Sequence, residues 1–208
     1  MNPWEQISLS DYENHMSLGS VLQLQTLNQI MKEQFENFNG TKTIAVLGVA
    51  GGNGIEHIRR KSFEKVYGID INADYLKEVE KRFADLHGIL ECKKINLITE
   101  ADILPESECV IANLLIEYIG YDAFKNVLGK MQAKKVSCVI QINESQEQWV
   151  SDSPYIHVFD GLDSVHTQVT KEGLVKCLNQ YKLCSKKEYP LPNGKKLVML
   201  DFCVRIER

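Results

Sequence analysis

The sequence has no excess of positive charge and no long apolar run. Its 208 residues carry 24 Lys and Arg against 28 Asp and Glu, which gives a formal net charge of -4. Proteins that bind mainly the nucleic-acid backbone usually have a basic excess, so we expect no nucleic-acid partner. The basic group at Arg59, Arg60 and Lys61 is interpreted as a solvated helix end.

The chain also lacks the apolar segments that direct proteins to or across membranes. No stretch approaches the ~18 consecutive apolar residues typical of a membrane-spanning helix. Residues 1–16 contain neither the basic nor the apolar part of a secretory signal. We therefore expect a cytoplasmic protein with no membrane partner.

The cysteines show no C-x-x-C pair and no cluster with histidine. Most lie within apolar runs, where a free cysteine behaves as a small hydrophobic residue. We therefore expect reduced core residues and no metal site. The six are Cys92, Cys109, Cys138, Cys177, Cys184 and Cys203.

The N-terminal part of the chain has helical patterns. Ser10 and Glu13 have the spacing of a capping box, which predicts a helix start. Apolar residues then recur at roughly helical spacing as far as Asn39-Gly40. These residues are Leu18, Leu22, Leu27, Ile30, Met31, Phe35 and Phe38.

Short apolar runs alternate with helical patterns through the middle of the chain. This alternation implies parallel strands joined by crossovers, and hence a doubly wound α/β sheet. Strands are expected at 44–47, 65–71, 90–98, 109–115 and 136–142. One helix is expected to start with Ile55 and Ile58. The next is marked by Leu76, Val79, Phe83 and Leu86, and a third by Phe124, Val127, Leu128 and Met131.

The C-terminal part breaks the alternation. Leu174, Cys177, Leu178 and Tyr181 predict one more helix. Strand-like runs at 183–191 and 196–206 then flank Pro192-Asn193-Gly194, and Asn-Gly between two such runs is a strong hairpin signal. We predict an antiparallel hairpin on an otherwise parallel sheet, which a dinucleotide-binding fold does not require.

Glycine and acidic residues follow the first two predicted strands. Ligands of open α/β sheets bind beyond the carboxyl ends of the strands. The loop GVAGGNG at 48–54 lets backbone approach a ligand closely, and Asp70 follows the second strand. A carboxylate there suits the two hydroxyls of a ribose. The alternative is that Asp70 caps the next helix, for which Asn72 is better placed.

Polar residues also follow the third and fourth predicted strands. Asn96 carries a donor and an acceptor suited to the edge of an adenine, and Ile71 and Leu97 are placed to enclose the base. Asn113 follows the fourth strand. The alternative for either asparagine is a turn-forming role at the end of a strand.

Taken together, GVAGGNG, the acid in GIDI, the strand ends INL and IANL and the closing hairpin resemble the class I S-adenosylmethionine-dependent methyltransferases. The resemblance covers roughly residues 40–208. It implies a seven-stranded, mostly parallel sheet in the order 3-2-1-4-5-7-6. It also implies a single domain over residues 1–208, with residues 1–39 as a helical cap and 40–208 as the Rossmann-like core.

The resemblance also implies where S-adenosylmethionine, as the cofactor, would bind. The glycine loop would wrap its methionine end, Asp70 and Ile71 its ribose, and Asn96 and Leu97 its adenine. Asn113 would lie near the transferred methyl group. The loop residues carried over are Gly48, Val49, Ala50, Gly52, Asn53 and Gly54.

The glycine loop departs from both patterns with which it was compared. The acid that usually begins the family's loop is replaced by Gly48, and its first glycine by Ala50. Some other group or a water must therefore orient the cofactor's amino group. The dinucleotide pattern G-x-G-x-x-G fails as well, because Ala50 or His57 stands at a required glycine.

The acceptor is predicted only by class. The Asn/Asp-Pro-Pro-aromatic run of nitrogen methylases of adenine or glutamine is absent after Asn113. We therefore expect a small-molecule or protein acceptor. Its pocket would be built by the N-terminal helix, with Tyr12 and His15 on one face, by Glu117 and Tyr118, and by the aromatic segment 145–168.

His15 is the candidate general base, and Tyr118 is a second catalytic candidate that would position the acceptor. The alternative is that Tyr12 and His15 only pack their helix on the sheet. His57 and His87 are interpreted as structural. The N-terminal helix would cap its own site or that of a partner, so the oligomeric state stays open.

Two other classes of function compete with a methyltransferase. One is an NAD-dependent oxidoreductase, which usually has a larger substrate domain than this chain can supply. The other is a non-catalytic member of the methyltransferase fold that binds the cofactor or a partner without methyl transfer.

Overall fold

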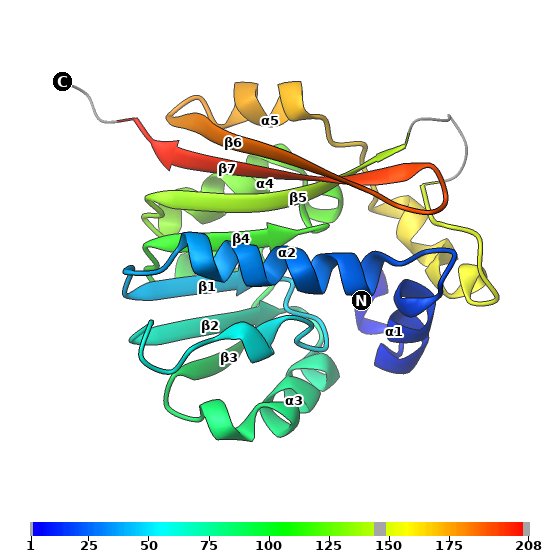
Figure 1. The fold of residues 1–208 in the computed structure, drawn as a ribbon, viewed down its shortest axis with the longest axis horizontal. Helices are drawn as coiled ribbons and strands as arrows, with labels where there is room; N and C mark the ends of the chain where they lie inside the picture. The colour runs from blue at the N-terminus through cyan, green and yellow to red at the C-terminus, as the bar shows by residue number, and fades with distance from the viewer. Residues whose placement is uncertain (1, 144–148, 206–208) are drawn as a thin grey trace.

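A single sheet organises the computed structural model, which describes residues 2–143 and 149–205. Its seven strands lie in the order β3-β2-β1-β4-β5-β7-β6 (Figure 1). Strands β1 to β5 are parallel, and β7 runs antiparallel between β5 and β6. The predicted fold class, strand order and closing hairpin are confirmed. The strands are β1 Thr43–Leu47, β2 Lys65–Asp70, β3 Leu90–Lys94, β4 Cys109–Asn113, β5 Lys135–Asn143, β6 Tyr181–Pro190 and β7 Lys195–Val204.

Helices cover both faces of the sheet (Figure 1). On one face α2 (Gln23–Asn37) and α3 (Ala73–Arg82) bury their apolar stripes with β1, β2 and β4. On the other, α4 (Ile116–Lys130) and α5 (Lys171–Cys177) do the same. The central strands β1 and β4 are buried on both sides, which explains their continuous apolar runs.

The register of the parallel strands brings their carboxyl ends to one edge. Leu47 at the end of β1 pairs with Ile69 of β2 and with Ala112 of β4. Asp70 pairs with Lys94 at the end of β3. The residues that follow these strands are therefore neighbours in space although they lie far apart in sequence.

The N-terminal helical region begins and divides differently from the prediction. The N-cap of α1 (Leu9–Ser17) is Ser8, whose Oγ accepts a hydrogen bond from Asp11 N at 3.1 Å, so the expected Ser10–Glu13 capping box is wrong. Leu22, the N-cap of α2, has a left-handed φ of 53°, which separates α2 from α1. The apolar pattern over 18–38 therefore belongs to two segments.

The segment after β1 is also shorter than predicted. Ile55–His57 forms a single 3-10 turn, η2, in place of a helix. Met31 and Phe35 of α2 cover the apolar surface that such a helix would have covered, packing with Ile55 and Val46. Thus α2 belongs to a layer of the core, whereas α1 lies at the carboxyl edge of the sheet (Figure 1).

Several element boundaries also differ from expectation, while one cap agrees with it. Strand β3 ends at Lys94, four residues early, and Tyr181 begins β6 instead of ending α5. Asn72 is the N-cap of α3, since its Oδ1 accepts hydrogen bonds from Asp74 N at 3.0 Å and Tyr75 N at 3.3 Å. Further 3-10 turns are η1 Pro3–Glu5, η3 Ala84–Leu86, η4 Ala101–Ile103 and η5 Ile156–Ser164.

The cysteines are less uniformly buried than predicted. Cys109 and Cys138 lie in the core and Cys184 is exposed, while the other three are half-buried. None of the six forms a disulfide. The expectation that they are core residues is therefore wrong for Cys184, which lies on the edge strand β6.

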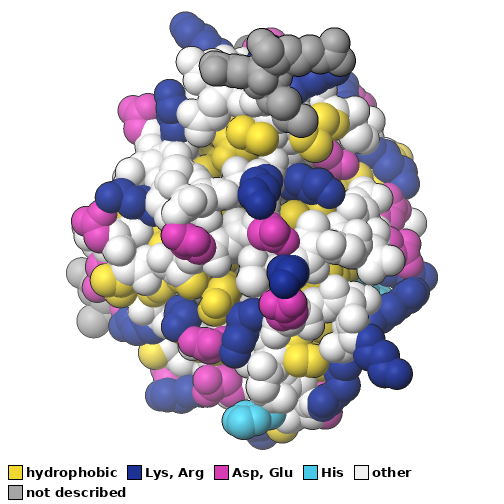
Figure 2. Space-filling model, turned by 90° about the vertical axis from the view of Figure 1, so that its left-hand side faces the viewer, with side chains coloured by type: hydrophobic (Ala, Val, Ile, Leu, Met, Phe, Trp, Pro, Cys, Tyr) yellow, Lys and Arg dark blue, Asp and Glu magenta, His cyan; other side chains and the backbone are white. Residues whose placement is uncertain are grey.

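The surface at which the parallel strands begin carries charges of both signs. Figure 2 shows Lys and Arg side chains interspersed with Asp and Glu on this face. Lys42 Nζ lies 3.0 Å from Glu64 Oε1, and Lys134 Nζ lies 3.6 Å from Glu108 Oε1. Exposed pairs of this kind contribute little stability, but they leave no basic stripe on this face.

Within the described residues, no helix has the length and apolarity to cross a membrane.

The packing of α2 against the glycine loop predicts an unequal response of two glycines to the same substitution. Gly54 has a φ of 89°, and a Cβ there would lie 2.4 Å from Met31 Cβ, whereas Gly88 has a φ of 91° and open space. Gly54→Ala should lower the free energy of unfolding by about 3 kcal/mol, and Gly88→Ala by about 1 kcal/mol. Urea unfolding of both variants measures the difference. Equal losses would contradict the close helix–loop contact.

Candidate functional site

Three adjoining cavities lie at the carboxyl edge of the sheet, and Tyr12 of α1 lines all of them. We name them by their walls. The strand-end cavity, of about 720 Å³, is bounded by Asp70, Ile71, Asn96 and Leu97. The glycine-loop cavity, of about 480 Å³, is bounded by residues 46–51, Asn53, Glu13 and Asn113. The aromatic cavity, of about 550 Å³, is bounded by Trp4, Tyr118, Trp149, Phe159 and His166.

Asp70 joins two loops at the strand-end cavity. Its Oδ2 accepts a hydrogen bond from Ala50 N, and its Oδ1 accepts one from Asn72 N, both at 2.9 Å. Burial raises the pKa of this carboxyl, and the backbone N–H groups oppose that shift. Each carboxylate oxygen has a further lone pair, so Asp70 retains acceptor capacity for a ligand in the cavity.

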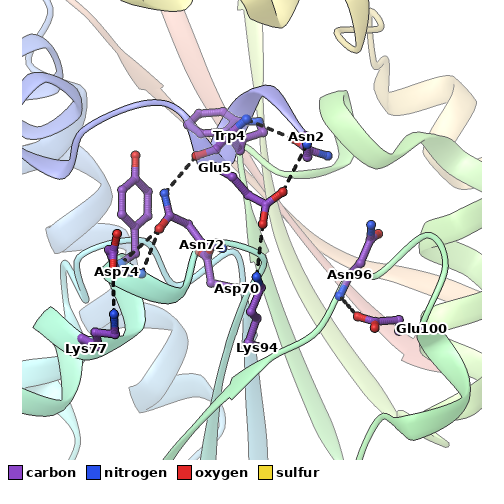
Figure 3. Close-up of polar contacts among 11 residues, drawn as sticks. Asn2, Trp4, Glu5, Asp70, Asn72, Asp74, Lys77, Lys94, Asn96 and Glu100 are labelled. Carbon is purple, nitrogen blue, oxygen red and sulfur yellow. Dashed lines mark hydrogen bonds and ion pairs between the residues drawn. The ribbon is translucent and has the colours of Figure 1, made fainter.

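The N-terminal turn lies across the strand-end cavity (Figure 3). Asn72 Nδ2 donates to Trp4 O at 3.0 Å, and Lys94 Nζ lies 3.2 Å from Glu5 Oε1. Asn2 and Trp4 line the cavity. Asn2 was missed from sequence, although Asn2 and Glu5 form a capping box whose N-x-x-E spacing was present to be found.

Asn96 lies at the strand-end cavity but acts as a turn former. Its backbone N–H donates to Glu100 Oε2 at 2.7 Å (Figure 3). Its Oδ1 accepts hydrogen bonds from Ile98 N at 3.0 Å and Thr99 N at 3.4 Å. Only its Nδ2 is left without a partner among the described residues. The side-chain carbonyl of Asn96 thus has the turn-forming role that was the alternative to binding adenine.

The glycine loop divides into residues that line the cavities and residues that pack behind them. Gly48 and Ala50 line both the strand-end and glycine-loop cavities and have left-handed φ values of 67° and 47°. Gly52 and Gly54 line none of the three cavities. A Cβ on Gly52 would lie 2.6 Å from Phe83 Cε2, so this glycine permits close packing on the α3 side.

Two further predicted loop residues line the glycine-loop cavity. Val49 is buried there, and Asn53 donates from Nδ2 to Leu24 O at 2.8 Å. This hydrogen bond ties the loop to α2. Asn53 is therefore partly committed to positioning the loop.

A carboxylate from α1 lies beside the glycine loop. Glu13 lines the glycine-loop cavity, and Arg82 Nη2 donates to Glu13 Oε2 at 3.0 Å. Arg82 Nη1 also donates to Gly51 O at 3.1 Å. Arg82 Nη1 donates to Glu13 Oε1 as well, so both carboxylate oxygens pair with this guanidinium, but the side chain of Glu13 remains 25% exposed. From sequence, Glu13 was expected only as a capping residue.

Asn113 lies at the junction of the strand-end and glycine-loop cavities but is held by α2. Its Nδ2 donates to Gln34 Oε1 at 2.8 Å, and its Oδ1 accepts from Gln34 Nε2 at 2.9 Å. Gln34 Nε2 also donates to Ser137 Oγ, which donates to Asp201 Oδ1. This buried network fixes the end of β4 and uses both polar atoms of the Asn113 amide.

Aromatic rings form the walls of the aromatic cavity. Trp4 meets Tyr118 edge-on, with ring centroids 4.8 Å apart, and Trp149 stacks on His166 at 4.0 Å. From the expected segment 145–168, Trp149, Phe159 and His166 line the cavity, whereas Tyr155 and His157 do not; residues 145–148 lie outside the described chain. Ser151 of the same segment lines it too, whereas Gln23 and Gln141 also line it and were missed. Gln141, a polar residue near the end of an apolar strand, was the available signal.

Tyr12, His15 and Tyr118 all reach the aromatic cavity, as their assignment to the acceptor pocket requires. His15 is buried, shares a 2.7 Å hydrogen bond between Nδ1 and Ser153 Oγ, and packs on Phe159. Burial and nearby Lys195 lower the pKa of His15 to about 4. The imidazole is therefore neutral near pH 7, which makes it a weak base. Burial raises the pKa of the Tyr118 phenol, so Tyr118 is a neutral donor or acceptor.

Glu117 is the least satisfied polar group of the site. Its Oε1 accepts a hydrogen bond from Gln141 N at 3.1 Å, while its Oε2 is buried without a partner in the described part of the chain. Burial raises the pKa of Glu117 to about 7, although backbone N–H groups lower it. Tyr12, His15, Tyr118 and His166 line the same cavity, and Cys138 lies near enough to feel its charge.

No cluster of three or more His, Cys, Asp or Glu side chains suited to a metal ion occurs in residues 2–143 and 149–205. The polar groups of the three cavities are instead hydrogen-bonding groups spread over apolar walls. This arrangement is typical of a pocket for an organic ligand.

The burial of Glu117 predicts a pH-dependent cost to folding. Above its ordinary pKa of 4.5 the unfolded chain ionises, while the folded side chain keeps its proton to about pH 7. Stability is therefore lost as pH rises through this window, and Glu117→Gln removes the loss. Relative to wild type, the variant should gain about 2–3 kcal/mol in free energy of unfolding between about pH 5 and about pH 8. Urea unfolding measures the gain, with exposed Glu64→Gln as control; a difference that does not change with pH would refute the prediction.

No protein-family model matches the chain, and no curated protein matches its sequence. Solved structures match most of its length. The magnesium protoporphyrin IX methyltransferase ChlM from Synechocystis PCC 6803 with bound SAM gives a TM-score of 0.66 at 11% identity, over 97% of this chain and 93% of that chain.

Two further structures show the range of proteins that share the fold. Geranyl diphosphate C-methyltransferase from Streptomyces coelicolor A3(2) gives a TM-score of 0.64 at 10% identity, over 85% of this chain and 77% of that chain. The [4+2]-cyclase SpnF gives 0.63 at 9% identity, over 88% and 82%. The chain therefore has the fold of the class I S-adenosylmethionine-dependent methyltransferases.

Proposed function

We propose that the chain is an S-adenosylmethionine-dependent methyltransferase that acts on a small-molecule acceptor. The observation that carries this proposal is the meeting of the three cavities at Tyr12. Two cavities surround the strand ends and the glycine loop, and the third is a separate aromatic chamber. A methyl donor and its acceptor need adjoining sites of this kind, because transfer requires the two reacting atoms to be aligned.

The residues of the first two cavities fit the cofactor. Asp70 offers acceptor capacity to the ribose hydroxyls, and Ile71 and Leu97 supply apolar walls for the adenine. Gly48 and Ala50 bring backbone to the place where the two cavities adjoin, as the amino-acid end requires. When bound, S-adenosylmethionine supplies an electrophilic methyl group on a sulfonium.

Glu13 supplies the carboxylate that the glycine loop lacks. The family's usual acid is replaced by Gly48, and Glu13 lines the same cavity from α1. A carboxylate there favours the ammonium of the amino-acid end over an uncharged ligand. The cap helix thereby takes over a role that the loop performs in the family pattern.

The aromatic cavity supports a small acceptor over a protein side chain. Rings from η1, α4 and the segment after β5 line it. Such rings offer flat apolar surface to a small organic molecule. Apolar ring surfaces solvate charge poorly, which favours a reaction in which the sulfonium charge is dispersed. Two of the neighbours, the magnesium protoporphyrin IX methyltransferase and geranyl diphosphate C-methyltransferase, are named for small-molecule substrates.

Calorimetric titration tests the function against its two competitors. The full chain should bind S-adenosylhomocysteine and S-adenosylmethionine more tightly than NAD. Binding of NAD with no response to either sulfur compound would overturn the proposal in favour of an oxidoreductase. Release of S-adenosylhomocysteine in a screen of small-molecule acceptors then separates an active enzyme from a non-catalytic member, which would bind the cofactor without turnover.

Asp70→Ala should weaken S-adenosylhomocysteine binding by roughly 1.5–3 kcal/mol, the scale of lost hydrogen bonds to a charged group. Asp74→Ala is the matched control, since Asp74 is exposed and pairs with Lys77 in the first turn of α3. Isothermal calorimetry measures both affinities, and urea unfolding checks that each variant folds. An unchanged affinity in Asp70→Ala would remove the ribose assignment.

Glu13→Gln should weaken binding of S-adenosylhomocysteine by about fivefold and leave 5′-methylthioadenosine, which lacks the amino-acid end, unaffected. Glu78→Gln is the control, because Glu78 also accepts a hydrogen bond from Arg82, at 3.1 Å, but lines neither cofactor-side cavity. Calorimetry with the two ligands measures the difference. Equal weakening of both ligands, or the same loss in Glu78→Gln, would show that Glu13 acts only through the packing of α1.

A further inference from the structure

The buried carboxylate of Glu117 lies among polar groups that have found partners. Gln141 Nε2 donates to Asn143 Oδ1 and to Trp149 O, both at 2.8 Å. Ser151 Oγ accepts from Asn193 Nδ2 at 2.8 Å. Against this background, Glu117 Oε2 is the one buried side-chain oxygen or nitrogen left without a partner in the described part of the chain. A buried acceptor without a partner lowers the free energy of unfolding. A ligand that donates a hydrogen bond to it therefore binds more tightly.

The position of Glu117 places it beside the junction of the cavities. It lies in the first turn of α4, four residues after Asn113 at the end of β4. Its neighbour Tyr118 lines both the strand-end and the aromatic cavities. Glu117 itself lines only the aromatic cavity. It therefore faces the side of the junction where an acceptor, and not the methyl donor, would lie.

The walls around Glu117 define the chemistry of that acceptor. Trp4, Tyr118, Trp149, Phe159 and His166 present ring surfaces, which favour a flat ligand. No Lys or Arg occurs among the described residues that line the cavity. The nearby ammonium of Lys195 donates to Trp149 O at 2.9 Å and to Ser151 Oγ at 3.3 Å, so it is engaged with the wall of the cavity. The cavity thus suits a neutral aromatic molecule that carries a hydrogen-bond donor.

We propose that the acceptor is a small, neutral aromatic or heteroaromatic compound whose ring N–H or O–H donates to Glu117 Oε2, and that Glu117 receives this proton on methyl transfer. This assignment rests on the proposed function. The acceptor nitrogen or oxygen forms a bond to the methyl carbon, and the methyl–sulfur bond breaks. The bonding pair stays on sulfur to give S-adenosylhomocysteine, and the acceptor proton moves to Oε2, so charge and atoms balance.

Glu117 is better suited to this role than the neighbouring candidates. His15 already uses Nδ1 with Ser153 and is a weak base, since its pKa is lowered to about 4. Burial lowers the pKa of His166, which makes its imidazole a weaker base. The raised pKa of Glu117, about 7, matches that of a base that both accepts and releases a proton near neutrality.

Intrinsic fluorescence offers a direct test, because both tryptophans of the chain, Trp4 and Trp149, line this cavity. The probes are benzimidazole, which has a ring N–H, and 1-methylbenzimidazole, which has none and resembles a methylated product. Each is titrated into the full chain saturated with S-adenosylhomocysteine. Wild type should bind benzimidazole at least about tenfold more tightly, the value of a hydrogen bond to a buried acceptor. Glu117→Leu should abolish this preference, and Glu64→Leu, on the opposite edge, should retain it.

The outcomes separate the two proposals. Equal affinity of wild type for both probes, binding of neither, or a preference that survives in Glu117→Leu would overturn the assignment of Glu117. The wild-type comparison decides the point even if Glu117→Leu does not fold. Calorimetry with S-adenosylhomocysteine is run on the same samples. Loss of that binding in wild type contradicts the proposed function, whereas retained cofactor binding without probe preference contradicts only the acceptor assignment.

Discussion

The strand-end cavity depends on one half-buried carboxylate. Asp70 accepts a backbone hydrogen bond from Ala50 in the glycine loop and another from Asn72 at the start of α3. These two bonds fix the loops after β1 and β2 relative to each other. Ala50 is held in a left-handed conformation that costs a non-glycine residue about 1–2 kcal/mol. Strain of this kind persists only where its surroundings over-determine it, and it recurs at functional sites.

The N-terminal segment forms part of the walls of all three cavities. The turn η1 crosses the ends of β2 and β3, and α1 contributes Tyr12 to all three cavities. The left-handed backbone at Leu22 changes the direction of the chain, so α1 lies over the carboxyl ends of the strands while α2 packs in the core. In this structure α1 lies beside the cavities of its own chain. The aromatic cavity is formed where η1, α1, α4 and the segment after β5 meet.

Much of the fold was predictable because local patterns and tertiary packing agree. The continuous apolar runs of β1 and β4, the Asn72 cap and the Asn193-Gly194 hairpin all lie where their chemistry predicts. The missing helix after β1 was not predictable, because Ile55 has the same apolar character in a 3-10 turn as in a helix. Only the packing of α2 on that face decides between the two.

The sequence predicts which residues lie at the carboxyl ends of the strands, but not which hydrogen bonds their side chains make. Sequence placed Asp70, Asn96 and Asn113 at one edge, yet Asn96 uses its carbonyl in a turn and Asn113 pairs with Gln34 of α2. Such partners depend on side-chain geometry across distant segments. The role of Glu117 was hidden for the same reason: its significance lies in a missing partner, which only the packed structure reveals.

A crystal structure of the full chain with S-adenosylhomocysteine would show whether the strand-end and glycine-loop cavities hold the cofactor. We expect ribose hydroxyls within hydrogen-bonding distance of Asp70, the amino-acid end beside Gly48 and Glu13, and the sulfur at Tyr12, facing the aromatic cavity. A ligand bound elsewhere, or one whose sulfur points away from the chamber lined by Glu117, would contradict this expectation.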